Sequence, residues 1–297
     1  MSTTNLVMSS SKPEKTEKTY LILETLQRMV KGPGALLGTI LFIIIVLSCI
    51  FAGWIAPYNP TDMDLAHMFS PPSRDHLLGT DGFGRDVMSR LLYGGRFSLA
   101  LGISASIVSS LAGVVIGSIA GYFGGKVETI IMRIIDIWSA IPAMLLCIVI
   151  STALGAGFLN TVLALSIGGI PTVVRLIRGQ ILSERSREYI EAAEAINCSR
   201  FSIMFRHLLP NVIQPVIVVT TMGIGMTITM AAGLSYIGLG VQPPTPEWGA
   251  MLSDARAHIL TYPYLIMFPG AIIALTVLAI NLMGDGLRDA LDPKLRR

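Results

Sequence analysis

Residues 186–211 read SREYIEAAEAINCSRFSIMFRHLLPN and form the longest charged interruption in the second half of an otherwise apolar chain. The first part, Arg187 to Ile196, is predicted to be a short helix, because its apolar residues recur at helical spacing. Glu188 and Glu191 lie near the start of that helix, where the helix dipole favours carboxylates. The residues that recur are Tyr189, Ala193 and Ile196, with Ile190 beside them.

A second short helix is predicted to follow the first. Asn197 can take the left-handed conformation that ends a helix. Ser199 is a suitable N-cap for a helix from Arg200 to Leu209, and Pro210 comes directly after it. The stretch is therefore predicted to be a helical hairpin that another protein could approach closely. The side chains on one side of it are small, since this side carries Ala192, Ala193 and Ala195.

The composition is that of a polytopic membrane protein and not of a soluble domain. Of the 297 residues, 52% are hydrophobic and 14% are charged, and the net charge is only +3. Cys49, Cys147 and Cys198 fall in or beside apolar runs at no metal-ligand spacing. They indicate no metal site and say nothing about disulfides.

The predicted fold is an all-α membrane protein with six transmembrane helices. The apolar runs cover residues 35–55, 97–122, 130–153, 158–178, 211–239 and 263–284, each long enough to cross about 30 Å of hydrocarbon. Residues 1–17 are expected to be a disordered tail, and 20–31 an amphipathic helix on the membrane surface. The chain is therefore predicted to divide into five parts. Residues 1–34 form a cytoplasmic tail that includes the amphipathic helix, residues 35–56 form the first transmembrane helix, and residues 57–96 form an extracytoplasmic loop. Residues 97–286 form a five-helix core that contains the 186–211 loop, and residues 287–297 form a cytoplasmic tail.

The positions of lysine and arginine predict the orientation of the chain. When the connections are assigned to alternate sides, 17 of the 22 basic residues fall on one side. Cytoplasmic loops carry the excess of lysine and arginine, so both termini and the 186–211 hairpin are predicted to be cytoplasmic. The five basic residues on the other side are Arg74, Arg85, Arg90, Arg96 and Arg256.

Several residues inside the predicted spans suggest how the helices pack. Glycines at four-residue spacing let helices approach backbone to backbone in lipid. Arg133 and Asp136 are expected to pair on one face of the third span. Pro142 and Pro171 each remove a backbone hydrogen bond and permit a bend. The spaced glycines are Gly113, Gly117 and Gly121.

The 186–211 loop resembles the EAA loop of ABC-importer permeases. The resemblance lies in Glu191-Ala192-Ala193 and in Leu209-Pro210 at the expected distance. The usual glycine of that loop is replaced by Asn197, which tolerates the same left-handed backbone. The alternative is an ordinary solvated helical loop between two spans.

Three more stretches are similar to the dipeptide/oligopeptide/nickel branch of these permeases, specifically to its "C"-type subunit. They are GTDGFGRDVMSRLLYGGRFSL at 79–99, LSYIGLGVQPPTPEWG at 234–249 and NLMGDGLRDALDPK at 281–294. The resemblance covers about residues 35–297, and the stretches occur in the expected order. In that family the EAA loop is the coupling helix that docks into a groove on an ATPase subunit.

The resemblance implies two functional surfaces in this chain. The first would couple to the ATPase: Glu191 would anchor the helix start, Ala192 and Ala193 would allow close seating, and Asn197 would set the turn. The second would dock a binding protein or form a gate, with a rigid interfacial turn without a partner as the alternative. The coupling residues are Glu188, Tyr189, Glu191, Ala192, Ala193, Ala195, Asn197 and Arg200. The docking residues are Gln242, Pro243, Pro244, Glu247 and Trp248. Trp248 is amphipathic and suits a membrane interface. The residues that follow, Gly249–His258, are expected to form a short surface helix.

The chain shows no sequence signature of an enzyme. Gly125-Lys126 is followed by Val127 where a phosphate-binding loop needs Ser or Thr, so ATP has to be bound by other subunits. The run 81–86 lacks the alternating ligands of a calcium loop. No nucleophile with a base and no zinc spacing occurs, so neither catalytic residues, metal nor cofactor are expected.

The family resemblance implies a permease of a type I ABC importer in a bacterial inner membrane. Its expected partners are a homologous second permease, two ATP-binding subunits, an extracytoplasmic substrate-binding protein and the lipid bilayer, with no nucleic acid. The expected cargo is di- or oligopeptides, with nickel chelates or glutathione as alternatives within the branch. A secondary transporter or channel is the alternative of another class, but it predicts mid-membrane charges and inverted repeats that the sequence lacks.

Overall fold

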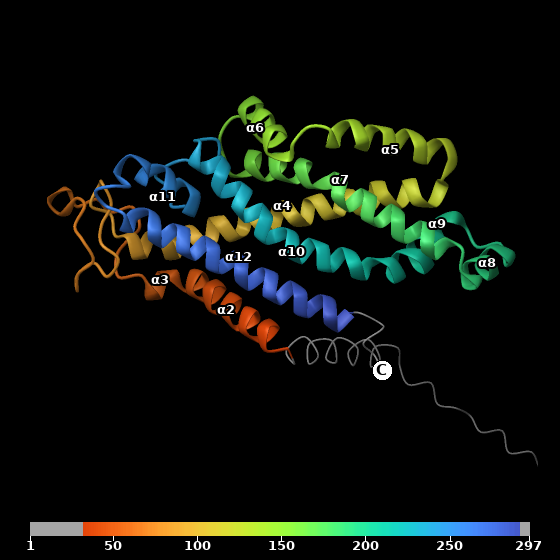
Figure 1. Ribbon diagram of the computed structural model, residues 1–297, viewed down its shortest axis with the longest axis horizontal. Coiled ribbons are helices and arrows are strands. Elements are labelled where there is room, and N and C mark those ends of the chain that lie inside the picture. The colour runs from red at the N-terminus through yellow and green to blue at the C-terminus, as the bar shows by residue number, and fades with distance from the viewer. Residues whose placement is uncertain (1–31, 292–297) are drawn as a thin grey trace, which may run out of the picture.

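Every regular element in residues 32–291, the part of the chain that the computed structural model describes, is helical (Figure 1). The long helices are α2 (Pro33–Ile50), α4 (Val87–Phe123), α7 (Phe158–Arg185), α10 (Leu209–Tyr236) and α12 (Tyr264–Leu291). The shorter ones are α3 (Ala52–Ile55), α5 (Gly125–Ser139), α6 (Ala143–Leu154), α8 (Glu188–Ala195), α9 (Arg200–Ser202) and α11 (Trp248–Ala255). The predicted tail 1–17 and surface helix 20–31 lie outside the described residues, as do residues 292–297.

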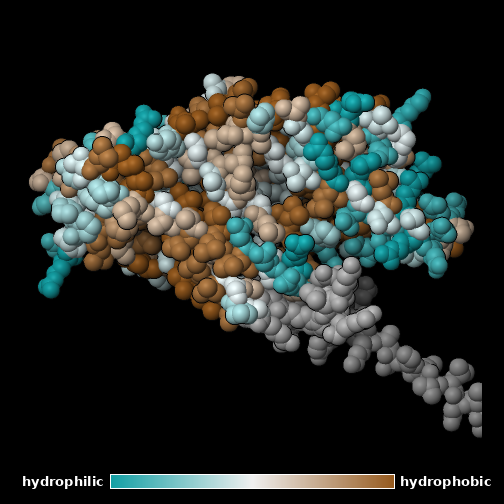
Figure 2. All heavy atoms as spheres, viewed as in Figure 1, coloured by the Kyte–Doolittle hydropathy of each residue, from teal (hydrophilic) through white to brown (hydrophobic). Residues whose placement is uncertain are grey.

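Five helical segments in residues 32–291 are long and apolar enough to cross a membrane. They are α2, α4, α7, α12 and the continuous segment Arg200–Tyr236. The pair α5 and α6 makes a sixth span if the two helices, bent by 86° at their junction, are counted as one. Apolar side chains cover the middle of the molecule, as expected of a surface in contact with lipid (Figure 2).

The long helices lie side by side along one axis (Figure 1). Helix α4 packs along α7, α10 packs on α4 and α12, and α2 packs on α12. Helices α8 and α9 lie at one end of the bundle, and α11 lies at the opposite end (Figure 1). Helix α2 runs toward the α11 end and α12 runs back from it, so the described chain starts and stops on the side facing α8.

Helices α4 and α7 make the close contact that the spaced glycines predicted. A Cβ atom at Gly117 would lie 2.7 Å from the carbonyl oxygen of Val174, and one at Gly121 would lie 3.0 Å from Ile181. Only hydrogen fits at such a distance, so α4 and α7 meet backbone to backbone. The expectation of close packing is confirmed.

Helix α4 corrects one expected boundary. The span expected at 97–122 starts earlier, inside the stretch expected to be the loop 57–96, because one helix runs from Val87 to Phe123. Gly94 and Gly95 do not break the helix, since they are the positions where other segments press on it. A Cβ at Gly95 would collide with the side chains of Cys49 and Trp248.

The third expected span, 130–153, is two helices and not one. Helix α5 ends at Ser139, and α6 starts after Pro142, whose missing N–H and fixed φ suit the residue before a helix. Pro171 has no such effect, because α7 continues through it.

The expected ion pair between Arg133 and Asp136 is also wrong. Asp136 pairs with Arg175 of α7, with 3.2 Å between carboxylate oxygen and guanidinium nitrogen. Sequence spacing brings Arg133 near Asp136, but the packing of α5 beside α7 offers a guanidinium across the helix interface, which spacing cannot reveal.

Candidate functional site

Helix α8 and the turn after it have the geometry predicted for the coupling loop. Helix α8 spans Glu188–Ala195, with Glu188 and Glu191 in its first turn. Asn197 has φ of +60°, and its N–H bonds the carbonyl of Glu194 at 2.9 Å. The N–H of Cys198 bonds the carbonyl of Ala193 at 3.1 Å, which completes a Schellman end in which asparagine replaces glycine.

The inner face of α8 joins the core of the bundle. Ile190 and Ala193 are buried in a cluster with Ile181 of α7, and with Ile203 and Leu208 from the segment leading into α10. The prediction that Ala193 allows a partner to sit close is therefore wrong, because only 5% of Ala193 is exposed and it packs inside the chain. Its small size lets α8 sit close to its own chain.

Tyr189 ties α8 to the two long helices that flank it. Its hydroxyl donates to a carboxylate oxygen of Glu184 at 3.0 Å and accepts from the amide nitrogen of Asn211 at 3.1 Å. Burial raises the pKa of Tyr189 above its ordinary value, so the hydroxyl stays protonated and able to donate at neutral pH. Arg187 adds an ion pair to Glu184 at 3.3 Å. Helix α8 is thus tied to the ends of α7 and α10.

The outer face of α8 is available to another protein. Glu188, Glu191, Ala192 and Ala195 are exposed, as is Arg200 beyond the turn. This end of the molecule is covered largely by hydrophilic side chains (Figure 2). The arrangement leaves a short helix with acidic and small residues on its open side.

Three exposed apolar residues at this end were not predicted as part of the site. Ile196, which follows the last residue of α8, is 76% exposed. Phe201 and Phe205 are also exposed, and their rings stack at 6.4 Å. Phenylalanines four residues apart in a charged loop are the sequence signal that could have revealed this surface.

The second short helix of the predicted hairpin is not separate. Ser199 caps α9 by accepting from the N–H of Ser202 at 3.3 Å, as predicted. A π-helical turn, Ile203–Leu208, then leads directly into α10. Pro210 falls in the first turn of α10, where no N–H is needed, so the proline does not end the helix.

Two of the predicted docking residues at the opposite end are buried. Glu247 and Trp248 are both 0% exposed. Glu247 caps α11 by accepting from the N–H of Ala250 at 2.9 Å and also accepts from the Ser98 hydroxyl at 2.7 Å. The indole of Trp248 donates to the carbonyl of Leu91 at 2.9 Å. The predictions that both residues belong to a docking surface and that Trp248 lies at a membrane interface are therefore wrong. Glu247 and Trp248 instead fasten α11 to α4.

The other three predicted docking residues lie at the surface. Gln242, Pro243 and Pro244 are exposed in the turn between α10 and α11. The Gln242 amide donates back to the carbonyl of Gly238 at 2.9 Å, which holds the turn closed. The short helix expected over Gly249–His258 is present as α11 and a single 3-10 turn, Arg256–His258.

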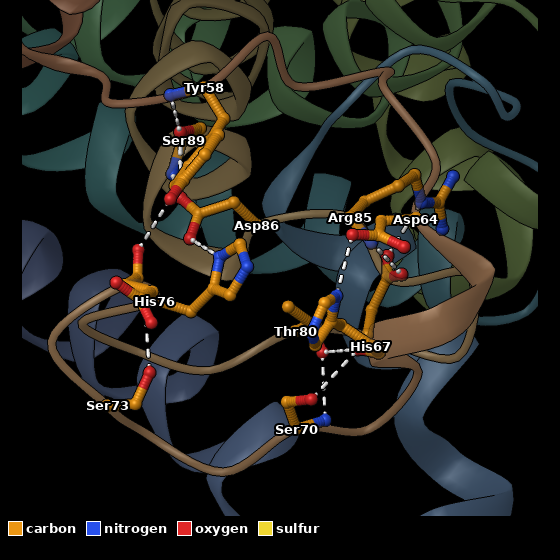
Figure 3. A network of polar contacts seen from close by, with 12 residues as sticks. Tyr58, Asp64, His67, Ser70, Ser73, His76, Thr80, Arg85, Asp86 and Ser89 are labelled. Atoms are coloured by element: carbon orange, nitrogen blue, oxygen red, sulfur yellow. Dashed lines mark hydrogen bonds and ion pairs between the residues drawn. The ribbon is translucent and has the colours of Figure 1, made fainter.

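A folded polar network joins residues 57–86 to the start of α4 (Figure 3). Asp86 caps α4 by accepting from the N–H and the hydroxyl of Ser89, at 2.8 and 2.7 Å. His76 lies 3.0 Å from the other oxygen of Asp86, and the N–H of Tyr58 donates to the Ser89 hydroxyl at 3.2 Å. Thr80 holds the far side of the loop by accepting from the N–H of Ser70 at 2.9 Å. The loop is thus a built element and not a loose connection.

Buried arginines fasten this loop to α11. Arg85 pairs with Asp81 at 2.7 Å and with Asp254 of α11 at 3.3 Å. Arg90 is also buried and lies 3.5 Å from Asp81. Within residues 32–291, no three His, Cys, Asp or Glu side chains gather closely enough to hold a metal ion.

Comparison with known proteins gives a consistent result. Residues 113–297 match the family described as binding-protein-dependent transport system inner membrane component, and residues 21–72 match the N-terminal transmembrane domain of oligopeptide transport permease C. The chain is 43% identical over 276 residues, 91% of each chain, to the di/tripeptide transport system permease protein of Pseudomonas aeruginosa. It is 45% identical over 258 residues, 86% of each chain, to the glutathione transport system permease protein of Pectobacterium atrosepticum.

The fold is similar to that of a solved transporter. A chain of the MetNI methionine ABC transporter, in an inward-facing conformation, matches with a TM-score of 0.53 and 19% identity. The match covers 68% of this chain and 97% of that one. At this identity the likeness concerns the fold alone, and it confirms the predicted type I importer-permease architecture.

Proposed function

Because this chain belongs to the family of binding-protein-dependent transport system inner membrane components, we propose that it is a permease subunit of an ATP-driven importer of di- and oligopeptides. The observation that carries the proposal is helix α8, an exposed acidic and alanine-bearing helix fixed to the ends of two spans. Such a helix passes a push from outside the membrane into the bundle.

The proposed partners follow from what the chain contains and lacks. Its sequence has no phosphate-binding loop, so two ATPase subunits supply the energy, and α8 docks in a groove of one of them. A second, homologous permease completes the path, and an extracytoplasmic binding protein delivers cargo. Closing of the ATPases on ATP pushes α8, and the spans move as rigid bodies between inward-facing and outward-facing states.

The 186–211 end is proposed to be cytoplasmic. Helices α2 and α12 start and stop on the side facing α8 (Figure 1), and 17 of the 22 basic residues are assigned to that side. The residues of 57–86 and helix α11 would then face outward, where a binding protein arrives. The proposed location is a bacterial cell membrane, which the chain crosses several times with both termini in the cytoplasm.

Peptides are the proposed cargo because two relatives, both similar over most of the chain, carry di/tripeptide and glutathione transport in their names. Glutathione is itself a tripeptide, so a peptide backbone is the chemistry that the two names share. Nickel chelates and glutathione remain the alternatives within the branch.

The proposal is tested with the assembled complex in liposomes. A tagged chain should copurify with two ATPase chains and a sister permease, and the complex should import labelled dipeptides only with ATP and the binding protein. Uptake of nickel chelates or glutathione in preference to dipeptides would show that the cargo is one of these alternatives. Transport or ATP hydrolysis by the purified chain alone would overturn the proposal and favour a self-sufficient carrier.

A further inference from the structure

A cavity of about 290 Å³ lies among α4, α6, α7 and α10, within the membrane-spanning part of the bundle. Its wall carries hydroxyls, glycines and apolar side chains and no charged residue. Small-molecule pockets usually hold ~300–1,000 Å³. The volume of this cavity lies just below that range.

Part of the polar wall is explained by helix packing. The Ser106 hydroxyl donates to the Thr227 hydroxyl at 3.1 Å, and the hydroxyls of Ser110 and Thr220 lie 2.6 Å apart. Both pairs join α4 to α10, and hydroxyl pairs of this kind hold helices together in lipid. These four residues alone would not require a ligand.

Two other hydroxyls of the wall have no such explanation. Ser109 is 6% exposed and Thr172 is exposed, both line the cavity, and neither makes a side-chain hydrogen bond within residues 32–291. Ser109 and Thr172 line the cavity, and a hydroxyl can both donate and accept. Both hydroxyls are therefore available to a molecule that enters the cavity.

The surroundings of the cavity are unsuited to contact with lipid. Thr172 lies one helical turn before Arg175, which pairs with Asp136 in an ion pair whose side chains are about half exposed. Charges that face lipid are costly, so this pair faces protein or water. The non-helical junction between α5 and α6 is exposed beside them, and Ala143 at its end lines the cavity. Irregular backbone at membrane depth is tolerated where it borders a water-filled space.

We propose that this cavity is the share of the peptide path contributed by this chain, and that its hydroxyl wall hydrogen-bonds the peptide backbone without selecting side-chain charge. This inference rests on the proposed function. Hydroxyls donate and accept, so they match both the N–H and the carbonyl that every peptide presents. An uncharged wall penalises neither acidic nor basic side chains.

Gly223 of α10 offers a test with a matched control. A Cβ added at Gly223, which lines the cavity, meets no atom within 4 Å, and the same is true of Gly270 in α12, which is not in the cavity wall. Leucine is also the better helix former, by ~1 kcal/mol per residue. Gly223→Leu in the assembled complex should lower dipeptide uptake by roughly tenfold or more, because a close-packed wall leaves the added side chain only the cavity to fill. Gly270→Leu should transport as wild type.

The readouts separate this inference from the proposed function. If the wild-type complex imports no peptide, the proposed function fails. If the wild type imports peptide and Gly223→Leu does so equally well, the cavity is not on the path. ATPase activity stimulated by the loaded binding protein should persist in Gly223→Leu, because α8 is untouched. If the variant loses both this activity and the assembly of the complex, the substitution has caused a folding defect.

Labelling settles the matter if Gly223→Leu does not assemble. Gly223→Cys, in a Cys198→Ser background, should react with a membrane-impermeant thiol reagent, and millimolar dipeptide should slow the reaction during turnover. The other cysteines of the chain, Cys49 and Cys147, are buried. No reaction, or a reaction that dipeptide leaves unchanged, would overturn the inference.

A charge placed in the wall tests the absence of charge selection. Thr172→Asp should raise the uptake of lysine-containing over glutamate-containing dipeptides several-fold, and salt should reduce the effect. Thr172→Asn, which adds a polar group of similar size without charge, should leave the ratio as in wild type. An unchanged ratio in Thr172→Asp would mean that peptides do not pass this wall.

Discussion

Asn211, in the first turn of α10, donates a hydrogen bond of 3.1 Å to the hydroxyl of Tyr189 in α8. The same hydroxyl donates to Glu184, near the end of α7, so one phenol joins three helices. Short, directional contacts thereby join α8 to two spans. These contacts are the basis for proposing that α8 passes a push to the spans.

Tyr189→Phe should loosen this connection without unfolding the bundle. The ring keeps its packing, and the two lost hydrogen bonds are each worth about 1 kcal/mol. We expect the complex to assemble and hydrolyse ATP, but to import fewer peptides per ATP. The measurement is the ratio of uptake to phosphate release in liposomes. An unchanged ratio would show that α8 is held by its apolar face alone.

Ala192→Asp and Ala193→Asp, one residue apart, should fail in different ways. Ala193 is buried in the core cluster, where an unpaired carboxylate costs about 3 kcal/mol or more. Ala193→Asp should therefore destabilise the hairpin itself. Ala192 is exposed, so Ala192→Asp should keep the fold and lower stimulated ATPase activity by disturbing the docking surface.

Thermal unfolding in detergent and stimulated ATPase activity distinguish these two variants. Ala192→Asp should have a wild-type Tm and low stimulation, and Ala193→Asp a lowered Tm. Full stimulation in Ala192→Asp would mean that the open face of α8 is not the docking element.

The difference between these two alanines also marks the limit of the sequence prediction. Helical spacing located α8, its acidic start and the left-handed Asn197, because these depend on neighbours in sequence. Spacing could not decide whether Ile190 or Ile196 faces inward, since both fit the period, and only the approach of Ile203 and Leu208 decides it. Likewise, a proline-rich run with a tryptophan suggests a surface, but the Ser98 hydroxyl and the Leu91 carbonyl, about 150 residues away, bury Glu247 and Trp248.

Gly117→Ala should destabilise the bundle, although alanine is the better helix former. The added Cβ would lie 2.7 Å from the Val174 carbonyl oxygen, so α4 and α7 would have to separate. Overpacking of this kind costs about 1–3 kcal/mol. Gly179→Ala on α7 is the matched control, since a Cβ there meets nothing within 4 Å. Tm in detergent should fall for Gly117→Ala and hold or rise for Gly179→Ala, and equal values would contradict the close contact.

Glu247→Ala should act on the stability of the α11 end of the bundle and not on the docking of a partner directly. The carboxylate caps α11 and accepts from the Ser98 hydroxyl, and losing a cap costs about 1 kcal/mol. The Ser98 hydroxyl would lose its acceptor but would still accept from the N–H of Trp248. Gln242→Ala removes an exposed side chain in the same loop and its hydrogen bond to the Gly238 carbonyl, so Tm should fall less than for Glu247→Ala. Titration of stimulated ATPase activity with the binding protein separates the two effects. If Gln242 contacts the partner, its variant needs more binding protein to reach half-stimulation. A stable Glu247→Ala with weakened docking would restore Glu247 to the contact surface, against its burial.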